Sequence, residues 1–141
     1  DVIFGAGGIA GCPTESEQAR RANLAIIAKA DITYLHIFPY SPRPGTPAAD
    51  MPQTPALVIK QRAAELRALG AVRLANFLDS ATGKRDQLLV EVGNRGHGRN
   101  FAKIRLEGDF IPSGQLVDVE LIGRDGDGLV GCAVAKGAQR A

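Results

Sequence analysis

Cysteine is scarce in this sequence, and it has neither a long apolar run nor a strong excess of one charge. Cys12 and Cys132 form no C-x-x-C pair, which argues against a disulfide framework or a self-contained metal site and favours a reduced, cytoplasmic setting. No run approaches the ~18 residues of a membrane span, and no signal peptide opens the chain. The 17 basic and 15 acidic residues leave a net charge of +2, so a nucleic-acid-binding surface would have to be local.

The remaining composition suits a folded protein. With 141 residues, 45% of them hydrophobic, the chain can form one ordinary domain, or a piece of one followed by a small module. It begins at Asp1 without a methionine and enters an apolar segment at once. We therefore expect a fragment of a longer protein.

The N-terminal part alternates between strand and helix patterns. A buried strand with a glycine-rich turn is predicted over 1–11 and a second strand over 32–38. The capping-box spacing of Thr14 and Glu17 opens a helix that ends near residues 29–31, and Thr54 with Pro55 opens a long one that continues through Gly70. This order predicts parallel strands in half of a β/α barrel or in a doubly wound sheet.

The pattern changes near residues 80–84, which predicts an α/β region over 1–80 and an all-β region over 81–141. Short alternating segments predict strands over 87–92, 101–106, 115–122 and 129–134. Turns are predicted between them, over 93–98, 112–114 and 125–128. Strands this short and closely spaced indicate a small OB-like antiparallel barrel.

The glycines from Gly5 to Gly8 loosely fit a dinucleotide-binding fingerprint, which we reject. Pro13 lies where the nucleotide-binding helix should continue, and the acidic candidate Asp31 precedes its strand instead of following it. Cys12, Cys132 and His36 are more simply explained as packed residues than as ligands.

The segment Leu35–Ala48, LHIFPYSPRPGTPA, is the most informative in the chain. A strand here enters a loop stiffened by three prolines, at the position where α/β proteins keep their sites. Tyr40, Ser41, Arg43 and Thr46 are therefore candidate site residues. The guanidinium of Arg43 could bind a carboxylate or a phosphate through two parallel hydrogen bonds. Alternatively, Arg43 makes an ion pair across the domain boundary.

A basic run without acidic residues lies in the all-β region, between residues 93 and 106. If Ala102 and Ile104 face the core, then Phe101, Lys103 and Arg105 share the outer face and could bind RNA by stacking and by phosphate contacts. A merely solvated strand face is the alternative. The full candidate RNA-binding set is Arg95, Arg99, Phe101, Lys103 and Arg105. The cations of the preceding helix are expected to be solvated: Lys60, Arg62, Arg67 and Arg73.

Three segments carry a resemblance to a known family. Residues 35–48 resemble the Tyr-Ser-Pro-Arg-Pro-Gly-Thr-Pro-Ala segment of the radical S-adenosylmethionine methylthiotransferases. Residues 9–15, IAGCPTE, resemble that family's Ile-x-Gly-Phe-Pro-x-Glu strand end, with Cys12 in place of phenylalanine. The C-terminal region is similar to the TRAM domain, an OB-like RNA-binding barrel. The resemblance implies the last two strand-helix units of a radical SAM barrel followed by TRAM.

The family binds S-adenosylmethionine and two 4Fe-4S clusters. By resemblance, the S-adenosylmethionine contacts in this chain are Ile9, Gly11, Tyr40, Ser41 and Arg43. The cluster-binding cysteines of the family are absent, so the chain alone is expected to bind no iron and to be inactive; the catalytic residues are not identified.

The implied partners are the tRNA anticodon stem-loop and the missing N-terminal part of the same enzyme. The segment His-Ile-Phe-Pro-Tyr-Ser-Pro-Arg-Pro is most similar to the branch that acts on threonylcarbamoyladenosine. The isopentenyladenosine and ribosomal-protein branches are alternatives, as is a non-catalytic RNA-binding module.

Overall fold

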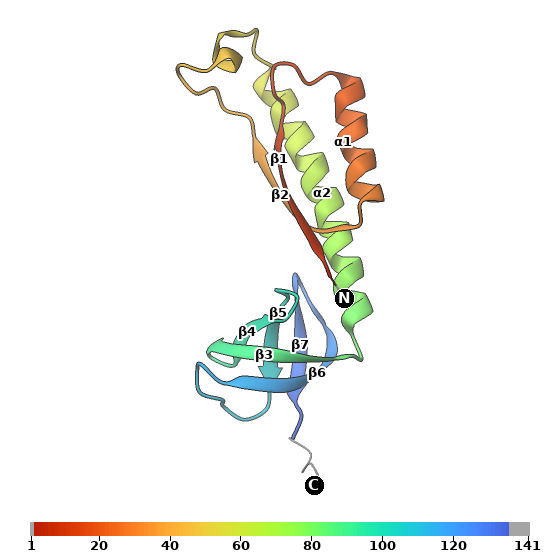
Figure 1. Cartoon of the computed structure of the whole chain (residues 1–141), viewed down its shortest axis with the longest axis vertical. Helices are drawn as coiled ribbons and strands as arrows, with labels where there is room; N and C mark the ends of the chain where they lie inside the picture. Colours follow the sequence, from red (N-terminus) through yellow and green to blue (C-terminus); the bar gives the residue numbers. More distant parts are fainter. Residues whose placement is uncertain (1, 136–141) are drawn as a thin grey trace. The chain divides into compact units, whose positions relative to one another are not determined.

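The computed structural model describes residues 2–135; Asp1, where the first predicted strand was to begin, lies outside them. The chain divides into two compact units, Asp1–Leu74 and Ala75–Ala141, and the division falls within the long helix α2 (Figure 1). None of the described helices is long and apolar enough to cross a membrane.

The first unit has the predicted order of elements: β1 (Phe4–Ala10), α1 (Glu17–Lys29), β2 (Ile32–Pro39), a short 3-10 turn (Pro47–Asp50) and α2 (Ala56–Ala81). The two strands pair in parallel, as predicted, with Ile9 beside Phe38. The predicted glycine-rich turn is wrong, because Gly5, Gly7 and Gly8 lie inside β1.

The helix starts differ slightly from those predicted. Ser16, and not Thr14, caps α1: its hydroxyl accepts a hydrogen bond of 3.0 Å from the Ala19 amide. The long helix begins at Ala56, one residue after Pro55, and it passes through Gly70 without a break, as predicted. Gly70 has a packing role, since a Cβ there would lie 3.1 Å from Leu35 Cβ.

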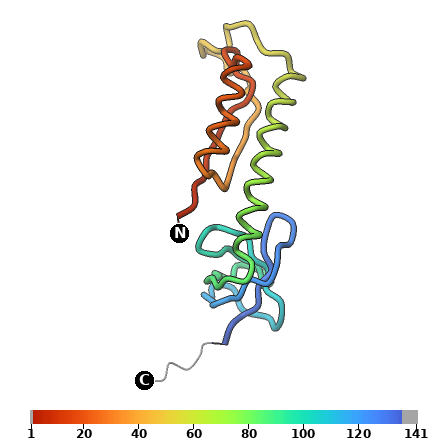
Figure 2. The backbone as a smooth tube through the Cα atoms, turned by 90° about the vertical axis from the view of Figure 1, so that its right-hand side faces the viewer, coloured from red at the N-terminus to blue at the C-terminus, as the bar shows by residue number. Residues whose placement is uncertain are grey.

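The core of the first unit lies between the two strands and the two helices, which cover the same face of the strand pair (Figures 1 and 2). Its buried members come from all four elements: Ala10, Ile27, Ile37, Ala63 and Leu66. Burial of each large aliphatic side chain contributes about 1.5–3 kcal/mol. The opposite face of the strands is uncovered within the described residues, so the prediction of a strand buried on both faces is wrong for β1, where Phe4 is 57% exposed.

Three arginines of α2 are not solvated, contrary to the prediction. Arg67 donates to the Ile37 carbonyl (3.1 Å), and Arg73 donates to the Ile32 carbonyl (3.2 Å) and to the Asp31 carboxylate. Arg62 pairs with Glu15. Their long side chains therefore fasten α2 to the strands and to the turn after β1, a role that periodicity does not reveal.

The second unit contains a closed five-stranded barrel: β3 (Arg85–Val92), β4 (Arg95–Gly98), β5 (Lys103–Glu107), β6 (Leu116–Asp125) and β7 (Gly128–Ala133). Around the barrel the strand order is β3-β4-β5-β7-β6. This confirms an α/β region followed by a small OB-like barrel. The barrel is not wholly antiparallel, because β5 and β7 pair in parallel.

Alternation along the strands fills the barrel. Leu88, Val90, Ile104, Val119 and Leu129 are at most 2% exposed and point inward. Leu78, from the last turns of α2, is also fully buried.

Strand β4 was predicted as a turn, because two of its four residues are glycine. Gly96 is needed there for a different reason: a Cβ would lie 1.8 Å from the Leu89 carbonyl oxygen of β3. The tight turn before β4 uses Gly93 and Asn94, both with positive φ near 60°, as a two-residue type I′ hairpin requires.

Candidate functional site

The carboxyl ends of β1 and β2 bring two of the predicted cofactor-binding segments together. Ala10 pairs with Pro39, and the Tyr40 amide donates to the Ala10 carbonyl at 2.8 Å, so pairing continues past the end of β2. Gly11 and Tyr40 therefore leave the sheet side by side. Such an edge is where α/β proteins place ligands.

The turn after β1 is fixed by a largely buried ion pair. The guanidinium of Arg62 donates to the Glu15 carboxylate (2.8 Å) and to the Glu15 carbonyl (2.9 Å), and Glu15 also accepts from the Gly11 amide at 3.4 Å. The Glu15 side chain is 7% exposed. Sequence reasoning noted Glu15 only as part of a motif and missed Arg62; a buried carboxylate needs such a partner.

Gly11 faces helix α2 on the side where a Cβ would be. Its φ is +84°, and a Cβ would lie 2.6 Å from Ile59 Cγ1. The glycine is thus explained by packing of the turn against α2, and contact of its backbone with a cofactor stays a prediction.

Ile9 lies on the uncovered face of the strands. It is 58% exposed beside Phe38, which is 62% exposed. His36 is exposed on the same strand, and it has no hydrogen-bond or ion-pair partner among residues 2–135. The prediction that His36 is packed and hydrogen-bonded is therefore wrong, because the helices cover only the other face.

The proline loop holds its shape through its own backbone. The carbonyl of Arg43 accepts from the Thr46 hydroxyl (2.8 Å) and from the Thr46 amide (3.3 Å). The side chains of Ser41 and Arg43 are exposed, and Arg43 has no ion-pair partner among the described residues. Thr46 is thus a structural residue of the turn, whereas the Arg43 guanidinium is available to a ligand.

Tyr40 carries a buried hydroxyl without a hydrogen-bond partner in the described part of the chain. Leaving such a group unsatisfied costs about 1–3 kcal/mol. A bound molecule that accepts or donates a hydrogen bond at this point would remove that cost. Tyr40 is therefore the predicted cofactor contact with the strongest physical support.

The described residues offer no ligand set for a metal cluster. Cys12 and Cys132 are free and belong to different units, and no three His, Cys, Asp or Glu residues within 2–135 lie close enough to hold a metal ion. An iron-sulfur cluster needs about four thiolate ligands, so the residues present do not fit one.

In the barrel, the inward and outward positions of β5 follow the prediction. Ala102, Ile104 and Leu106 are buried, whereas the side chain of Lys103 is 65% exposed and that of Arg105 38%. Arg95 of β4 pairs with Arg105 across the strands, and His97 pairs with Lys103. Phe101 is 75% exposed, but it lies in the turn before β5 with φ of 59°.

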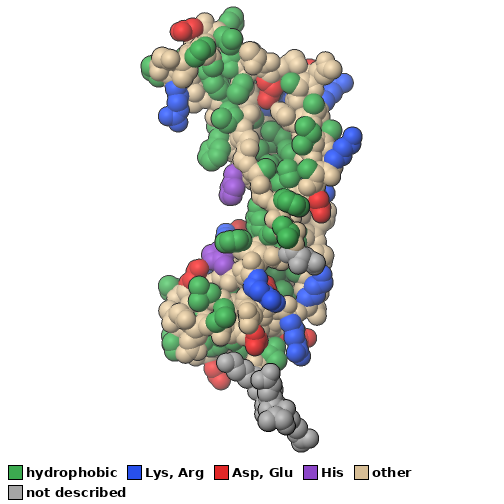
Figure 3. Space-filling view, in the orientation of Figure 1, with side chains coloured by type: hydrophobic (Ala, Val, Ile, Leu, Met, Phe, Trp, Pro, Cys, Tyr) green, Lys and Arg blue, Asp and Glu red, His purple; other side chains and the backbone are tan. Residues whose placement is uncertain are grey.

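The structure changes the interpretation of this basic run, because acidic residues from other segments pair with it. Lys103 bonds to Asp127 (2.7 Å), and Arg105 contacts Asp125 (3.3 Å) and Glu107 (3.8 Å). Arg95 is the member of the set without an ion pair in the described region. Figure 3 likewise shows Lys and Arg interspersed with Asp and Glu on the visible face of the barrel. Residues 84–135 hold seven basic and eight acidic residues, so the barrel there has no basic excess.

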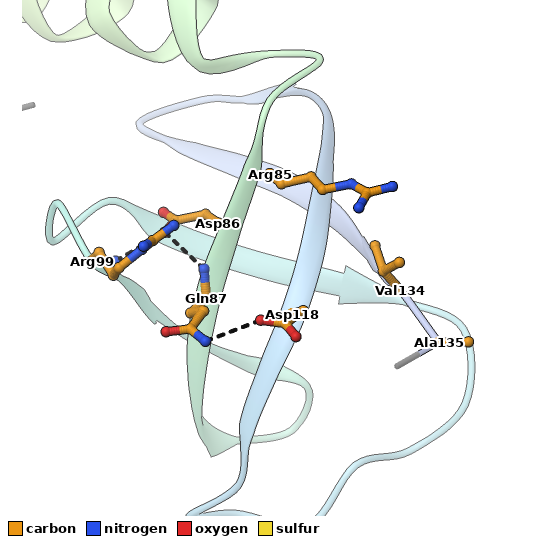
Figure 4. Close-up of a pocket in the computed structure, with 7 residues that line it drawn as sticks. All are labelled: Arg85, Asp86, Gln87, Arg99, Asp118, Val134 and Ala135. Carbon is orange, nitrogen blue, oxygen red and sulfur yellow. Dashed lines mark hydrogen bonds and ion pairs between the residues drawn. The ribbon is translucent and has the colours of Figure 1, made fainter. Parts of the chain in front are cut away.

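Arg99 is directed away from the outer face of β5. It donates to Asp86 at 3.0 Å and helps to line a shallow pocket of about 230 Å³ with Arg85, Gln87 and Asp118 (Figure 4). The two guanidinium groups are balanced by two carboxylates. The pocket therefore offers no excess positive charge to a phosphate, although Arg85 itself has no ion pair among the described residues.

The pKa of Asp127 is lowered because Lys103 donates a hydrogen bond to its carboxylate and adds a favourable charge interaction. This carboxylate stays ionised at neutral pH and competes with any RNA phosphate for Lys103.

Comparison with known proteins identifies relatives of the whole chain, although no family model matches it. It is 40% identical over 134 residues to the threonylcarbamoyladenosine tRNA methylthiotransferase MtaB of Rickettsia prowazekii (strain Madrid E), covering 95% of this chain and 31% of that protein. The protein of the same name from Aquifex aeolicus (strain VF5) is 36% identical over 79% of this chain and 27% of its own length. The chain is homologous to the C-terminal part of these tRNA methylthiotransferases.

A second group of tRNA methylthiotransferases is nearly as similar. The tRNA-2-methylthio-N(6)-dimethylallyladenosine synthase 1 of Mycobacterium marinum (strain ATCC BAA-535 / M) is 37% identical over 80% of this chain and 24% of that protein. Across these relatives the chain spans 24% to 31% of the length.

Proposed function

We propose that the chain is the C-terminal portion of a tRNA methylthiotransferase that acts on threonylcarbamoyladenosine next to the anticodon. The observation that carries the proposal is the 40% identity to a protein of that name over 95% of the chain. The parallel strands, the proline loop and the barrel agree with the order of elements that the resemblance implied.

In the complete protein, S-adenosylmethionine and two 4Fe-4S clusters would supply the radical and the sulfur that convert an unreactive C–H bond into a methylthio group. The chain's own contribution is binding. Ile9 offers an apolar surface, the Tyr40 hydroxyl a buried hydrogen bond and Arg43 a guanidinium for a carboxylate, with Gly11 and Ser41 beside them. The cluster ligands lie outside this chain, which is inactive alone.

The barrel is proposed to hold the anticodon stem-loop on the face formed by β4 and β5. Arg95, Lys103 and Arg105 lie there on neighbouring strands, and Phe101 at the adjoining turn offers an exposed ring for a splayed base. Asp125 and Asp127 weaken this surface until a phosphate displaces them. Arg99 contributes from the neighbouring pocket.

The activity is tested with the complete reading frame that contains these residues. Cells lacking their own enzyme are complemented with it, and their tRNA nucleosides are analysed by mass spectrometry. We expect the methylthio derivative of threonylcarbamoyladenosine. Its loss in Arg43→Ala and its retention in Lys60→Ala, an exposed cation of α2 in the same unit, would support the cofactor role of Arg43. A methylthio derivative of dimethylallyladenosine alone would contradict the proposed substrate.

Inactivity of the chain alone is tested by anaerobic reconstitution. Retention of stoichiometric iron by residues 1–141 would contradict it.

The RNA-binding face is tested by titrating an anticodon stem-loop at several salt concentrations. Replacing Lys103 and Arg105 together with alanine should lower the slope of log affinity against log salt by about 1.4, or 0.7 for each phosphate contact with single-stranded RNA. An unchanged slope would place the RNA on another surface of the barrel.

A further inference from the structure

The uncovered face of the β1–β2 pair has an unusual chemical make-up. Side chains alternate along the strands, so Ala10 and Ile37 face the helices while Ile9, His36 and Phe38 point the other way. Ile9 and Phe38 are apolar. His36 is thus an exposed nitrogen donor on a face made mostly of apolar side chains and glycine.

His36 is accessible and uncommitted. It pairs in register with Gly7, and a Cβ on Gly7 would meet only the His36 carbonyl oxygen, at 3.9 Å. No side chain of β1 therefore fills the space beside the imidazole. The other histidine of the chain, His97, differs in this respect because it bonds to Glu91 at 2.9 Å.

The arrangement of the helices indicates where this face points in a complete barrel. In β/α barrels the helices form the outer ring, and the strand faces turned away from them line the interior. The helices α1 and α2 both pack on the face that holds Ile37. His36 therefore lies on the inner face, four residues before Tyr40 along the same strand and its extension.

The two substrates named for the relatives differ at one group. Threonylcarbamoyladenosine carries a carboxylate and a hydroxyl on the group attached to adenine, whereas the dimethylallyl group is a hydrocarbon. An imidazole has an N–H donor in either protonation state and can bond to a carboxylate. Against a hydrocarbon, the same imidazole would lose its water without gaining a partner.

We propose that His36 selects the threonylcarbamoyl group over the dimethylallyl group by donating a hydrogen bond to its carboxylate. The inference rests on the proposed function, because it assigns a specificity-determining residue to that reaction. Sites that hydrogen-bond a polar group of the substrate reject analogues without it more strongly than apolar pockets reject an added group. His36 therefore affects the ratio of affinities for the two substrates more than the binding of tRNA itself.

The test measures binding, not turnover. The complete protein is titrated with two anticodon stem-loops that differ only in carrying threonylcarbamoyladenosine or dimethylallyladenosine. We expect the wild-type protein to favour the first by about tenfold or more, as a hydrogen bond to a charged group predicts. His36→Phe should abolish this ratio mainly by weakening the first complex, and His36→Asn, which keeps an N–H donor, should retain part of it.

His97→Ala serves as the matched control, because it removes the other histidine while leaving this face intact; the ratio should not change even if both affinities fall. Circular dichroism verifies that the His36 variants fold. An unchanged ratio in folded His36→Phe, or a wild-type protein that binds both stem-loops equally, would overturn the role of His36 and leave tRNA binding standing. Failure of the wild-type protein to bind either stem-loop would instead contradict the proposed function, and with it this inference.

Discussion

Gly11 and Ile59 approach so closely that a side chain on Gly11 would overlap the helix: a Cβ would lie 2.6 Å from Ile59 Cγ1 and 3.0 Å from Ile59 Cα. Gly11 also has a φ of +84°, which side-chain-bearing residues rarely adopt. The contact fixes the turn after β1 against α2, directly beside the segment that starts at Tyr40. Position 11 thus sets the geometry of the proposed cofactor site without having to touch the cofactor.

Gly11→Ala should therefore destabilise the first unit by about 2–5 kcal/mol, combining the cost of a left-handed backbone with that of overpacking. Urea unfolding followed by helical circular dichroism measures the change. Gly45→Ala is the matched control, because Gly45 has φ of +83° with nothing within 4 Å of its Cβ position, so only the backbone cost of about 1–2 kcal/mol remains. Equal losses in the two variants would show that the Ile59 contact contributes nothing.

Gly96→Ala should prevent β3 and β4 from pairing, because the new methyl group would lie 1.8 Å from the Leu89 carbonyl oxygen. Backbone cannot move aside as a flexible side chain can, so we expect a loss of more than about 3 kcal/mol. Amide hydrogen exchange of the barrel core measures it. Gly123→Ala, where a Cβ would meet nothing within 4 Å, should leave the exchange rates of the core nearly unchanged.

These glycines show where sequence reasoning about the fold stops. Helical spacing and strand alternation predicted nine of the elements' approximate positions because each pattern reflects local burial. A glycine has two common uses, in turns and in close backbone approaches, and the sequence does not separate them. The residues from Gly5 to Gly8 and those of β4 were both assigned to turns for this reason.

The candidate sites show a similar division. The loop at Tyr40–Thr46 was predictable because its residues are contiguous and stiffened by prolines. The charge of the RNA-binding face was not, because Asp125 and Asp127 pair with β5 only after β7 has joined the barrel beside it. In the same way, the role of Arg62 depends on Glu15, 47 residues away.

Glu17 should titrate far below the ordinary range of a glutamate. A hydrogen bond from Arg20 lowers the pKa of its carboxyl from 4.5 to about 2. A lowered pKa means that this ionised group stabilises the fold above its unfolded pKa, and the contribution is lost as the pH falls through the folded value. Carboxyl carbon NMR should therefore show Glu17 titrating near 2 in the wild type and nearer 4.5 in Arg20→Ala, with a smaller rise in Arg21→Ala. A wild-type value near 4.5 would contradict the hydrogen bond.

Asp127→Asn should strengthen RNA binding by the barrel, because it releases Lys103 from the carboxylate 2.7 Å away. Exposed ion pairs contribute about 0.2–1 kcal/mol, which corresponds to a gain of up to about fivefold in affinity. The same substitution should slightly lower stability at neutral pH. Since Lys103 lowers the pKa of Asp127, the wild-type pair stabilises the barrel above the ordinary pKa of aspartate, and the difference between the proteins should vanish as the pH falls through the lowered pKa.

Asp109→Asn separates release of Lys103 from the general effect of removing one negative charge. It changes the net charge equally, and its carboxylate pairs with no cation among the described residues. We expect Asp127→Asn to bind the anticodon stem-loop more tightly than Asp109→Asn does, and to show a steeper salt dependence because one more cation reaches the phosphates. Equal affinities would mean that Lys103 does not contact RNA, and the β4–β5 face would then lose its central cation.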